Sequence, residues 1–384
     1  MDRNLFKYFE RQSDFKMLIR SAELLSALSF SHVCVVPARS EVERLPHLVS
    51  SLEIAARGFS PLMILVLNSC EDSELSEISE QQTTEDSLVK RFSVSSRCGD
   101  LLLLMGGSLS ILVIDRWSKG RQFLTHQGVG TARKIGCDVA TFLQTNGIVR
   151  CPFVLSTDAD ARVPEDYFSA LDQISGEICL AYYAFKHAPE GSDQQKLAMS
   201  IYEQWIHHYV DSLKVAGSVF AVPALGSIYA IHCRSYIQVR GFPERKAGED
   251  FYLMNKLLKV GRSQKIQTQD PIELSGRLSN RVPFGTGPTL SRWSQIENLH
   301  RERVFYNPQS FLVLRDFLNL ERSIDPRFLP LSLLELRDQF LDRHPRRFHD
   351  RFDALKTLKL IHHLRDHHFG NLSLEDLRRL SKAA

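Results

Sequence analysis

Two acidic residues near the middle of the chain have the spacing of a divalent-metal site. Asp158 and Asp160 stand two residues apart, shortly after the apolar segment 153–155. On an extended strand end such side chains face the same side, so two carboxylates could share one cation. An acid-x-acid triplet arises often by chance and then usually marks a solvated turn. Here Pro164, which suits the first turn of a helix, follows soon after, and this placement favours a functional site.

A second acidic pair, Glu249 and Asp250, lies far along the chain between Gly248 and the apolar helical pattern 251–258. Acids at a helix N-terminus are favoured by capping and by the helix dipole, so isolated pairs of this kind are more often caps than catalysts. The preceding glycine, and the long uncharged stretch 215–233 that returns the chain to the sheet, favour projection of one carboxylate into the same cleft. An aspartate of ordinary pKa is ionised at neutral pH and could take a proton as general base.

A glycine-containing helix start carries two basic residues. Gly128 and Gly130 precede Arg133 and Lys134. The third glycine of a dinucleotide-binding fingerprint would fall on Arg133, so that motif is incomplete, and no P-loop occurs in the sequence. Backbone N–H groups and basic side chains at a helix start could hold an anionic group. A helix whose basic residues face water stays an equal alternative.

The histidines and cysteines are weaker candidates. A pair of histidines one helical turn apart could bind a metal, but the charged residues around this group favour a hydrated helix face. The group comprises His362, His363, His367 and His368. The seven cysteines form no C-x-x-C pair, which indicates small core residues in a reducing compartment. No Ser-His-Asp or Cys-His signature is present.

The elements that would position these residues alternate along the chain. Strands separated by helices, and buried on both faces, indicate the α/β class with a mainly parallel sheet flanked by helices. Short β-branched runs predict strands at 33–36, 63–67, 111–114 and 153–155, and helical patterns occur at 42–57, within 73–105 and at 131–143. Sheets of this kind bind ligands at the carboxyl ends of their strands, where the polar residues of this chain gather.

Three regions follow from these patterns. The patterns predict amphipathic N-terminal helices at residues 1–30, a domain built on the sheet at residues 31–288, and a C-terminal helical appendage at residues 289–384. The stretch 275–288 is rich in glycine, proline and arginine, which predicts an ordered or gated loop.

The composition excludes several classes of protein. Of 384 residues, 43% are hydrophobic and 24% are charged, as in ordinary globular proteins and unlike disordered or collagen-like chains. A net charge of +3 gives no reason to expect a nucleic acid partner. The N-terminal segment lacks the uninterrupted apolar region of a signal peptide, so we expect a cytoplasmic protein. A basic tail and an amphipathic N-terminus would tolerate peripheral contact at the inner membrane surface.

Taken together and in order, five segments resemble the GT-A glycosyltransferases of the family 2 type, which use nucleotide-sugar donors. The segments are 35–41, 66–72, 130–136, 156–160 and 241–250, and the resemblance covers roughly residues 32 to 265. It implies a GT-A fold and the transfer of a sugar from a nucleotide-diphosphate sugar to an acceptor hydroxyl. The acceptor, the sugar and the base stay open.

The resemblance assigns donor-side roles to several residues. Pro37, Arg39 and Glu41 match the nucleotide pocket at the end of the first strand. Asn68 stands where many members carry an acid that holds the base, and this departure leaves the base preference open. Arg133 matches the basic residue near the base and diphosphate. The loop residues Arg277 and Arg281 are further candidates for holding the diphosphate.

The same resemblance assigns catalytic roles to the two acidic motifs. Asp158 is similar to the ribose-side or metal-side acid of the DxD motif, and Asp160 to its metal ligand. Asp250 is similar to the catalytic base of inverting members, with Glu249 near the acceptor. A bound Mg²⁺ or Mn²⁺ would stabilise the charge that develops on the leaving diphosphate.

Two other functions stay open at this point. Segment 128–131 is superficially similar to the G-x-G-T loop of sugar-phosphate nucleotidyltransferases, although it follows the third predicted strand and not the first. A non-catalytic GT-A-like binding or scaffold protein is the alternative from another class, with the helical tail as its docking surface. The presence of all four acids argues against a decayed site.

Overall fold

The computed structural model describes residues 3–12, 14–245, 247–278, 285–321, 323–340 and 348–383. Its contacts divide the chain into two compact units. The first comprises Met1–Ala188, Ala224–Ser275 and Val282–Gly285, and the second comprises Pro189–Pro223, Gly276–Arg281 and Thr286–Ala384. No described helix combines the length and the apolar character needed to cross a bilayer.

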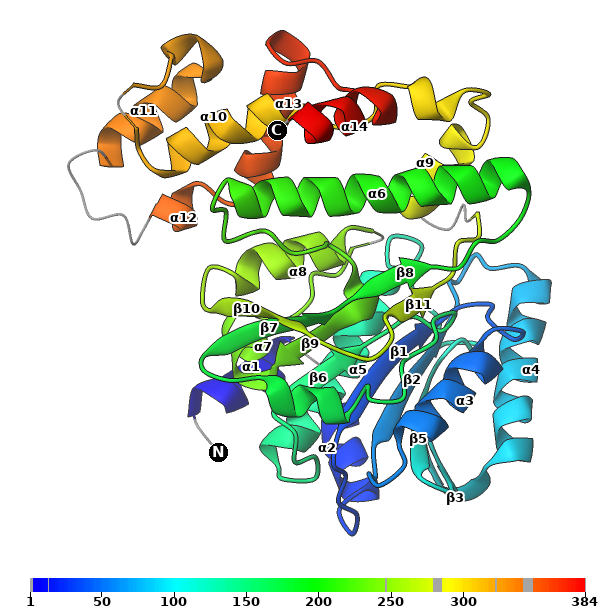
Figure 1. Ribbon diagram of the computed structural model, residues 1–384. Helices are drawn as coiled ribbons and strands as arrows, with labels where there is room; N and C mark the ends of the chain where they lie inside the picture. The colour runs from blue at the N-terminus through cyan, green and yellow to red at the C-terminus, as the bar shows by residue number, and fades with distance from the viewer. Residues whose placement is uncertain are drawn as a thin grey trace. The chain divides into compact units, whose positions relative to one another are not determined.

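A sheet of nine described strands forms the centre of the first unit (Figure 1). Its spatial order is β10-β7-β9-β6-β1-β2-β5-β4-β3. The strands are β1 Val33–Ala38, β2 Leu62–Asn68, β3 Ser93–Cys98, β4 Leu101–Gly106, β5 Leu109–Arg116, β6 Phe153–Ser156, β7 Ile178–Tyr183, β9 Tyr229–His232 and β10 Arg262–Ile266. The central pairs β6·β1, β1·β2 and β2·β5 are parallel, whereas β9 runs antiparallel to both β6 and β7. A separate parallel pair joins β8 Phe185–His187 to β11 Ile272–Leu274.

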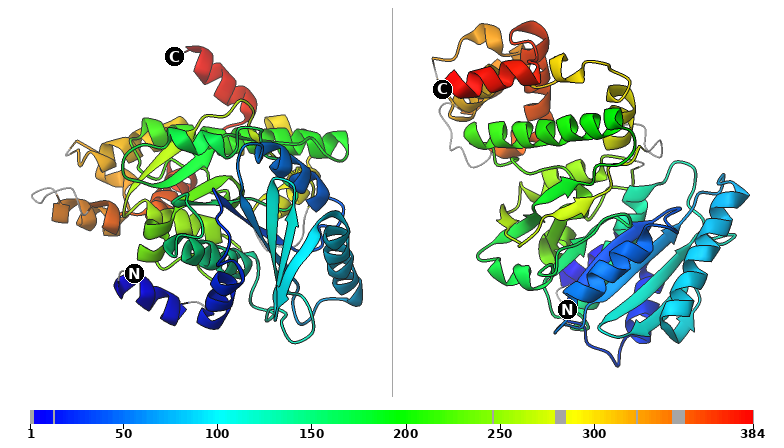
Figure 2. Two further views of the ribbon diagram at one scale, coloured as in Figure 1. Left: turned by 90° about the horizontal axis from the view of Figure 1, so that it is seen from below. Right: turned by 45° about the vertical axis from the view of Figure 1, so that its right-hand side comes forward.

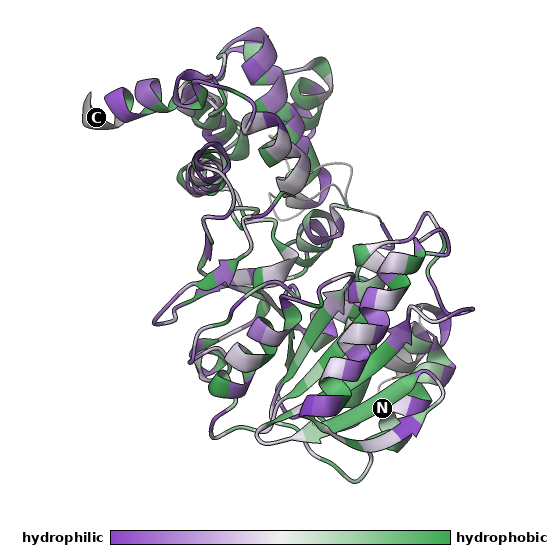
Figure 3. Ribbon diagram, turned by 90° about the vertical axis from the view of Figure 1, so that its right-hand side faces the viewer, coloured by the Kyte–Doolittle hydropathy of each residue, from purple (hydrophilic) through white to green (hydrophobic). Residues whose placement is uncertain are grey.

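Helices flank this sheet, so the predicted α/β class and mainly parallel sheet are confirmed. Strands β1 and β2 are buried along their whole length, as expected for strands covered on both faces. Figure 3 shows the strands as hydrophobic ribbons beside more hydrophilic helices. The helices of the first unit are α1 Arg3–Gln12, α2 Phe15–Leu24, α3 Leu45–Ala55, α4 Leu75–Arg91, α5 Val129–Thr145, α7 Cys233–Gln238 and α8 Glu249–Leu257. Figure 2 shows α3 and α4 beside the half of the sheet that contains β1, β2 and β5.

The helix predicted within 73–105 is α4, and it ends at Arg91. The following residues form the antiparallel hairpin of β3 and β4, which the sequence analysis did not predict. Gly99 has a φ of 62° at the turn, a conformation that glycine adopts without steric penalty. The four leucines 101–104 are buried in β4, which pairs with β5, so they serve as a core strand and not as a helix face.

Helix α5 packs closely on the sheet through a glycine. A Cβ atom built on Gly136 would lie 2.3 Å from Val35 Cγ1 and 3.3 Å from Val66 Cγ2. Gly136→Ala should therefore destabilise the fold by about 1–3 kcal/mol, because the helix must move away from β1. Urea unfolding measures this loss. Gly370→Ala is the matched control, since nothing lies within 4 Å of its added Cβ, and an equal loss in both variants would contradict the packing explanation.

The N-terminal helices pack on α5. The ring of Phe9 in α1 meets that of Phe142 in α5 edge-on, with centroids 5.1 Å apart. Residues 1–30 group with the sheet in the first unit.

The second unit is helical. Its core includes Phe311, Leu314 and Phe317 of one helix and Leu360 and Ile361 of another. The elements are α6 Asp193–Val215, α9 Thr286–Trp293, α10 Pro308–Leu318, α11 Leu331–Phe340, α12 Phe348–Arg351, α13 Ala354–His367 and α14 Leu374–Ala383, with 3-10 turns at Leu299–Arg301 and Pro326–Phe328. Helix α6, which precedes residue 289, groups with these helices and not with the sheet.

Candidate active site

The carboxyl ends of three strands meet at one edge of the sheet. Strand β1 pairs in parallel with β2 on one side and with β6 on the other. The residues that follow them therefore share that edge: Arg39 after β1, Asn68 at the end of β2, and Asp158 after β6. This is the position expected for the ligand site of such a sheet.

One buried arginine joins the two acidic motifs. Arg133, near the start of α5, is 3% exposed. Its Nη2 donates to Asp158 Oδ1 at 2.5 Å and its Nε donates to Glu249 Oε1 at 3.1 Å. Its Nη1 donates to Ser156 Oγ at 2.6 Å and to the Gly226 carbonyl at 3.3 Å. The strand end that carries Asp158 and the helix start that carries Glu249 are thus held by a single guanidinium.

Asp250 lies beside this cluster with a fixed orientation. Its Oδ2 accepts from the Gly226 N–H at 3.1 Å and its Oδ1 accepts from the Phe251 N–H at 2.7 Å. The preceding Gly248 has a φ of 72°, a left-handed conformation that lets the chain turn into α8. Burial raises the pKa of Asp250 above its ordinary value, opposed by the two N–H donors and by Arg133. Because Gly226 contacts both Asp250 and Arg133, the two acidic motifs lie in one cluster.

Glu249 is the most deeply buried of these acids, with 4% of the residue exposed. Burial, followed by the charge of Asp250, raises the pKa of Glu249 to about 7, although Arg133 opposes the shift. Glu249 can therefore change its protonation state near neutral pH.

This raised pKa predicts a pH-dependent stability. The folded chain binds a proton at Glu249 more tightly than the unfolded chain, in which a glutamate has a pKa of about 4.3. The stabilisation is fully present below that value and is lost as the pH rises through about 7. Relative to Glu249→Gln, which cannot titrate, the wild type should lose at most about 3 kcal/mol of unfolding free energy between about pH 4 and about pH 8. Urea unfolding of both proteins across this range measures it, and a constant difference would contradict the raised pKa.

Two residues of the cluster were not predicted as site residues. Ser156 lies in a segment quoted for the resemblance, but its serine hydroxyl gave no chemical signal of its own. Gly226 lies in the uncharged stretch 215–233, where a glycine marks a close approach. A Cβ there would lie 3.0 Å from the guanidinium carbon of Arg133, so any other residue would force the guanidinium to shift by a few tenths of an ångström.

The residues predicted to lie on the donor side contact their neighbours in the first unit. Arg39 forms a bidentate ion pair with Glu77 of α4, with N–O distances of 2.9 and 3.0 Å. Pro37 lies within β1, opposite Val66 of β2. Glu41 is 6% exposed in the turn before α3, where its carbonyl accepts from two backbone N–H groups.

Asn68 is held by the strands themselves. Its Nδ2 donates to the carbonyls of Ala38 and Val66, both at 3.0 Å, so both amide hydrogens are used. Gln81 of α4, which sequence analysis missed, is fully buried and donates to the carbonyls of Ala38 and Asn68. The amide side chains thus lock the ends of β1 and β2 together.

The acids that could hold a metal ion are those after β6. Asp160 is half-buried in the turn after Asp158, whose side chain is 40% exposed. The structure gives Asp158 Oδ2 no hydrogen bond from a described residue, while Oδ1 binds Arg133. Within the described part of the chain, no three His, Cys, Asp or Glu residues form a metal-binding group. Two carboxylates are the ligand type that Mg²⁺ or Mn²⁺ accepts, with water and phosphate oxygens as its remaining ligands.

The structure does not test the two loop arginines predicted to hold the diphosphate. Arg277 belongs to the second unit, and Arg281 lies outside the described residues. Their proposed contact with the diphosphate stays a prediction.

The expected anion cradle at the start of α5 is corrected by the structure. Lys134 is buried and its Nζ donates to Asp138 at 2.8 Å, next to the hydroxyl of Tyr8. The N–H of Gly130 donates to the Arg245 carbonyl at 3.2 Å, and a Cβ on Gly130 would lie 2.6 Å from that oxygen. The helix start therefore packs against the segment that leads to α8, and Lys134 stabilises the interior.

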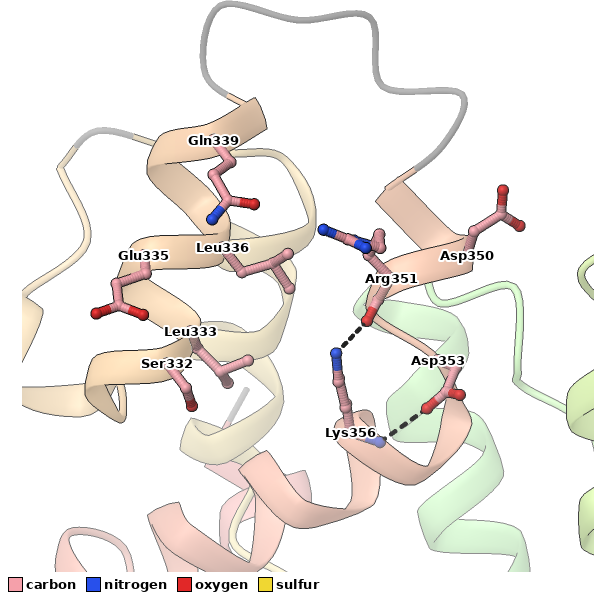
Figure 4. Close-up of a pocket in the computed structure, with 9 residues that line it drawn as sticks. All are labelled: Ser332, Leu333, Glu335, Leu336, Gln339, Asp350, Arg351, Asp353 and Lys356. Carbon is pink, nitrogen blue, oxygen red and sulfur yellow. Dashed lines mark hydrogen bonds between the residues drawn. The ribbon is translucent and has the colours of Figure 1, made fainter.

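Two features of the second unit have structural explanations. His362 lies 2.8 Å from the Tyr306 hydroxyl, and the described histidines of α13 form no metal-binding group. A cavity of about 320 Å³ lies beside the start of α13, where Lys356 N donates to Asp353 Oδ1 and Lys356 Nζ donates to the Arg351 carbonyl (Figure 4). The first of these bonds caps the N-terminus of the helix.

No protein-family model and no curated protein matches the chain. Among solved structures, it is similar to S. aureus TarS 1–349 in complex with UDP-GlcNAc, with 13% identity, 88% of this chain and 80% of that chain covered, and a TM-score of 0.39. It is also similar to the mannosyltransferase PcManGT from Pyrobaculum calidifontis in complex with GDP-Man and Mn²⁺, with 13% identity, coverages of 96% and 87%, and a TM-score of 0.34. A third is mannosyl-3-phosphoglycerate synthase from Rubrobacter xylanophilus, with 13% identity, coverages of 85% and 86%, and a TM-score of 0.35. These similarities assign no role to any residue of this chain.

Proposed function

We propose that this chain is a GT-A glycosyltransferase of the family 2 type that moves a sugar from a nucleotide-diphosphate sugar to an acceptor hydroxyl. One observation carries the proposal. Arg133 bridges Asp158, after β6, and Glu249, beside Asp250 at the start of α8, at the carboxyl edge of the sheet. This arrangement brings a metal-side acid and a base candidate into one site.

The donor would lie along the ends of β1, β2 and β6. Arg39, Glu41 and Pro37, which lie in or just after β1, would line the nucleotide side, and both amide hydrogens of Asn68 are used by the strands. The side-chain oxygen of Asn68 would then accept a hydrogen bond from the nucleobase of the donor. Asp158 and Asp160 would hold the Mg²⁺ or Mn²⁺, which when bound stabilises the negative charge on the leaving diphosphate.

Asp250 is proposed as the general base. Two backbone N–H groups orient its carboxylate and favour its charged form, so it can accept the proton of the acceptor hydroxyl during attack on the sugar. A single base on the acceptor side suits an inverting displacement. Glu249 would lie beside the acceptor, where Arg133 holds one of its oxygens.

The rival nucleotidyltransferase function needs an open triphosphate loop at 128–131. Gly130 is instead in close contact with Arg245 as part of the α5 start, which supports glycosyl transfer over nucleotidyl transfer. A purely structural scaffold would not require this cluster, because apolar side chains of similar size stabilise a fold at least as well as a buried ion pair.

A thermal-shift screen tests the donor site. A ligand that binds the folded state raises the melting temperature. We expect one or more of UDP, GDP and other nucleoside diphosphates to raise Tm in the presence of Mn²⁺ and much less in its absence. If no nucleoside diphosphate changes Tm with or without Mn²⁺ or Mg²⁺, the proposed function is wrong.

A further inference from the structure

The resemblance described in the sequence analysis implies that Arg133 contacts the donor, yet all its hydrogen bonds are internal. Its side chain is 4% exposed, against 40% for Asp158. Four hydrogen bonds tie the guanidinium to two carboxylates, one hydroxyl and one backbone carbonyl. The guanidinium is therefore far less exposed than the carboxylate that it binds, and its hydrogen bonds go to groups of the protein itself.

The charge of this arginine is permanent. Asp158, Glu249 and Asp250 all raise the pKa of Arg133, against the effect of burial, so the guanidinium stays protonated. It balances part of the negative charge of the acid cluster before any ligand binds. Without it, burying Glu249 beside Asp250 would leave like charges uncompensated.

The same charge opposes a divalent ion at the exposed side of Asp158. A carboxylate that already binds a guanidinium through Oδ1 offers less negative charge to a cation at Oδ2, and the two cations repel each other at short range. The described residues offer no third ligand of the His, Cys, Asp or Glu type. A diphosphate would supply both the missing oxygen ligands and the missing negative charge.

We propose that Arg133 is the resident counter-ion of this site, a positioning residue that holds the two acidic motifs together and makes binding of a divalent ion conditional on a diphosphate. The part of this inference that concerns the diphosphate rests on the proposed function, whereas the weak binding of Mn²⁺ alone does not. Arg133 would act through the two acidic motifs and not, as predicted from the sequence, by contacting the donor.

Calorimetric titration of Mn²⁺ into the full chain, with and without UDP or GDP, tests the inference. The wild type should bind Mn²⁺ weakly alone and at least about tenfold more tightly with a diphosphate. Arg133→Met should strengthen binding of Mn²⁺ alone by about tenfold or more, because the opposing charge is gone. Arg133→Lys keeps the charge and should bind Mn²⁺ alone as weakly as the wild type.

The controls separate charge from misfolding. Arg133→Met leaves Glu249 buried without its partner, so the double variant Arg133→Met/Glu249→Gln removes both charges of the pair and should fold. Its gain in Mn²⁺ affinity should be smaller than that of Arg133→Met, because a nearby negative charge is lost as well. Arg97→Met removes a surface arginine paired with Glu85 and should change nothing. Tight binding of Mn²⁺ alone by the wild type would overturn the inference. The inference would also be overturned if Arg133→Met left the affinity for Mn²⁺ alone unchanged and lowered the affinity for UDP tenfold, as expected for a direct donor contact.

The two proposals can fail separately. If no nucleoside diphosphate binds with Mn²⁺, the proposed function fails. The gain of Mn²⁺ affinity in Arg133→Met is measured without nucleotide and can still be observed. If the diphosphates bind but the gain is absent in both Arg133→Met and the double variant, the counter-ion role fails and the proposed function stands.

Discussion

Asp250→Asn is expected to lower the rate of sugar transfer by about 10³-fold or more, because the amide cannot accept the acceptor's proton. Donor binding should stay within about twofold of the wild type, since Asn has nearly the same shape and keeps an oxygen to accept one of the two backbone N–H groups. The measurement is the initial rate of nucleoside diphosphate release from whichever donor the wild type uses, together with calorimetric binding of that donor with Mn²⁺.

Asp211→Asn is the matched control for this variant. Asp211 lies on α6 with its side chain 67% exposed, and its substitution should leave both rate and binding unchanged. If Asp250→Asn transferred sugar at close to the wild-type rate, the base would have to be another residue. Glu249 would then be the next candidate.

Asp160→Ala is expected to abolish the part of donor binding that depends on Mn²⁺. Asp158 already shares one oxygen with Arg133, so Asp160 is the second carboxylate proposed to hold the ion. Its loss should weaken nucleoside diphosphate binding in the presence of Mn²⁺ by about 10²-fold or more, down to the level seen with chelator. Calorimetry with UDP or GDP, with Mn²⁺ and with EDTA, measures both states.

Asp172→Ala removes an exposed aspartate from a 3-10 turn on the same unit and should keep the full response to Mn²⁺. A tenfold or smaller effect of Asp160→Ala, with the Mn²⁺ response intact, would show that the ion is held elsewhere. In that case the assignment of the DxD segment as metal ligand would be wrong.

The sequence was informative where local pattern decides structure. Runs such as 63–67 are apolar on both faces, so a buried parallel strand was predictable, and the polar residues that follow such strands pointed to the ligand edge. The hairpin of β3 and β4 was missed because consecutive leucines at 101–104 suit a buried helix as well as a buried strand. Only the pairing with β5 decides between the two.

The charge network of the site was not predictable, because its partners are far apart in sequence. Arg133 and Glu249 are separated by 116 residues, and neither residue's neighbours indicate the other. The same holds for Lys134, whose partner Tyr8 lies 126 residues away on α1. Two adjacent basic residues on one helix look alike in sequence, yet one joins the acid cluster and the other stabilises the interior.

The central claim is that two remote acidic motifs form one site for sugar transfer from a nucleotide diphosphate. Chromatography of the products formed by the wild type from a panel of UDP-sugars and GDP-sugars with Mn²⁺ tests it most directly. We predict release of a nucleoside diphosphate and transfer of the sugar to a hydroxyl, lost in Asp250→Asn. Stable donors throughout the panel, together with pyrophosphate release from a nucleoside triphosphate and a sugar phosphate, would contradict the claim.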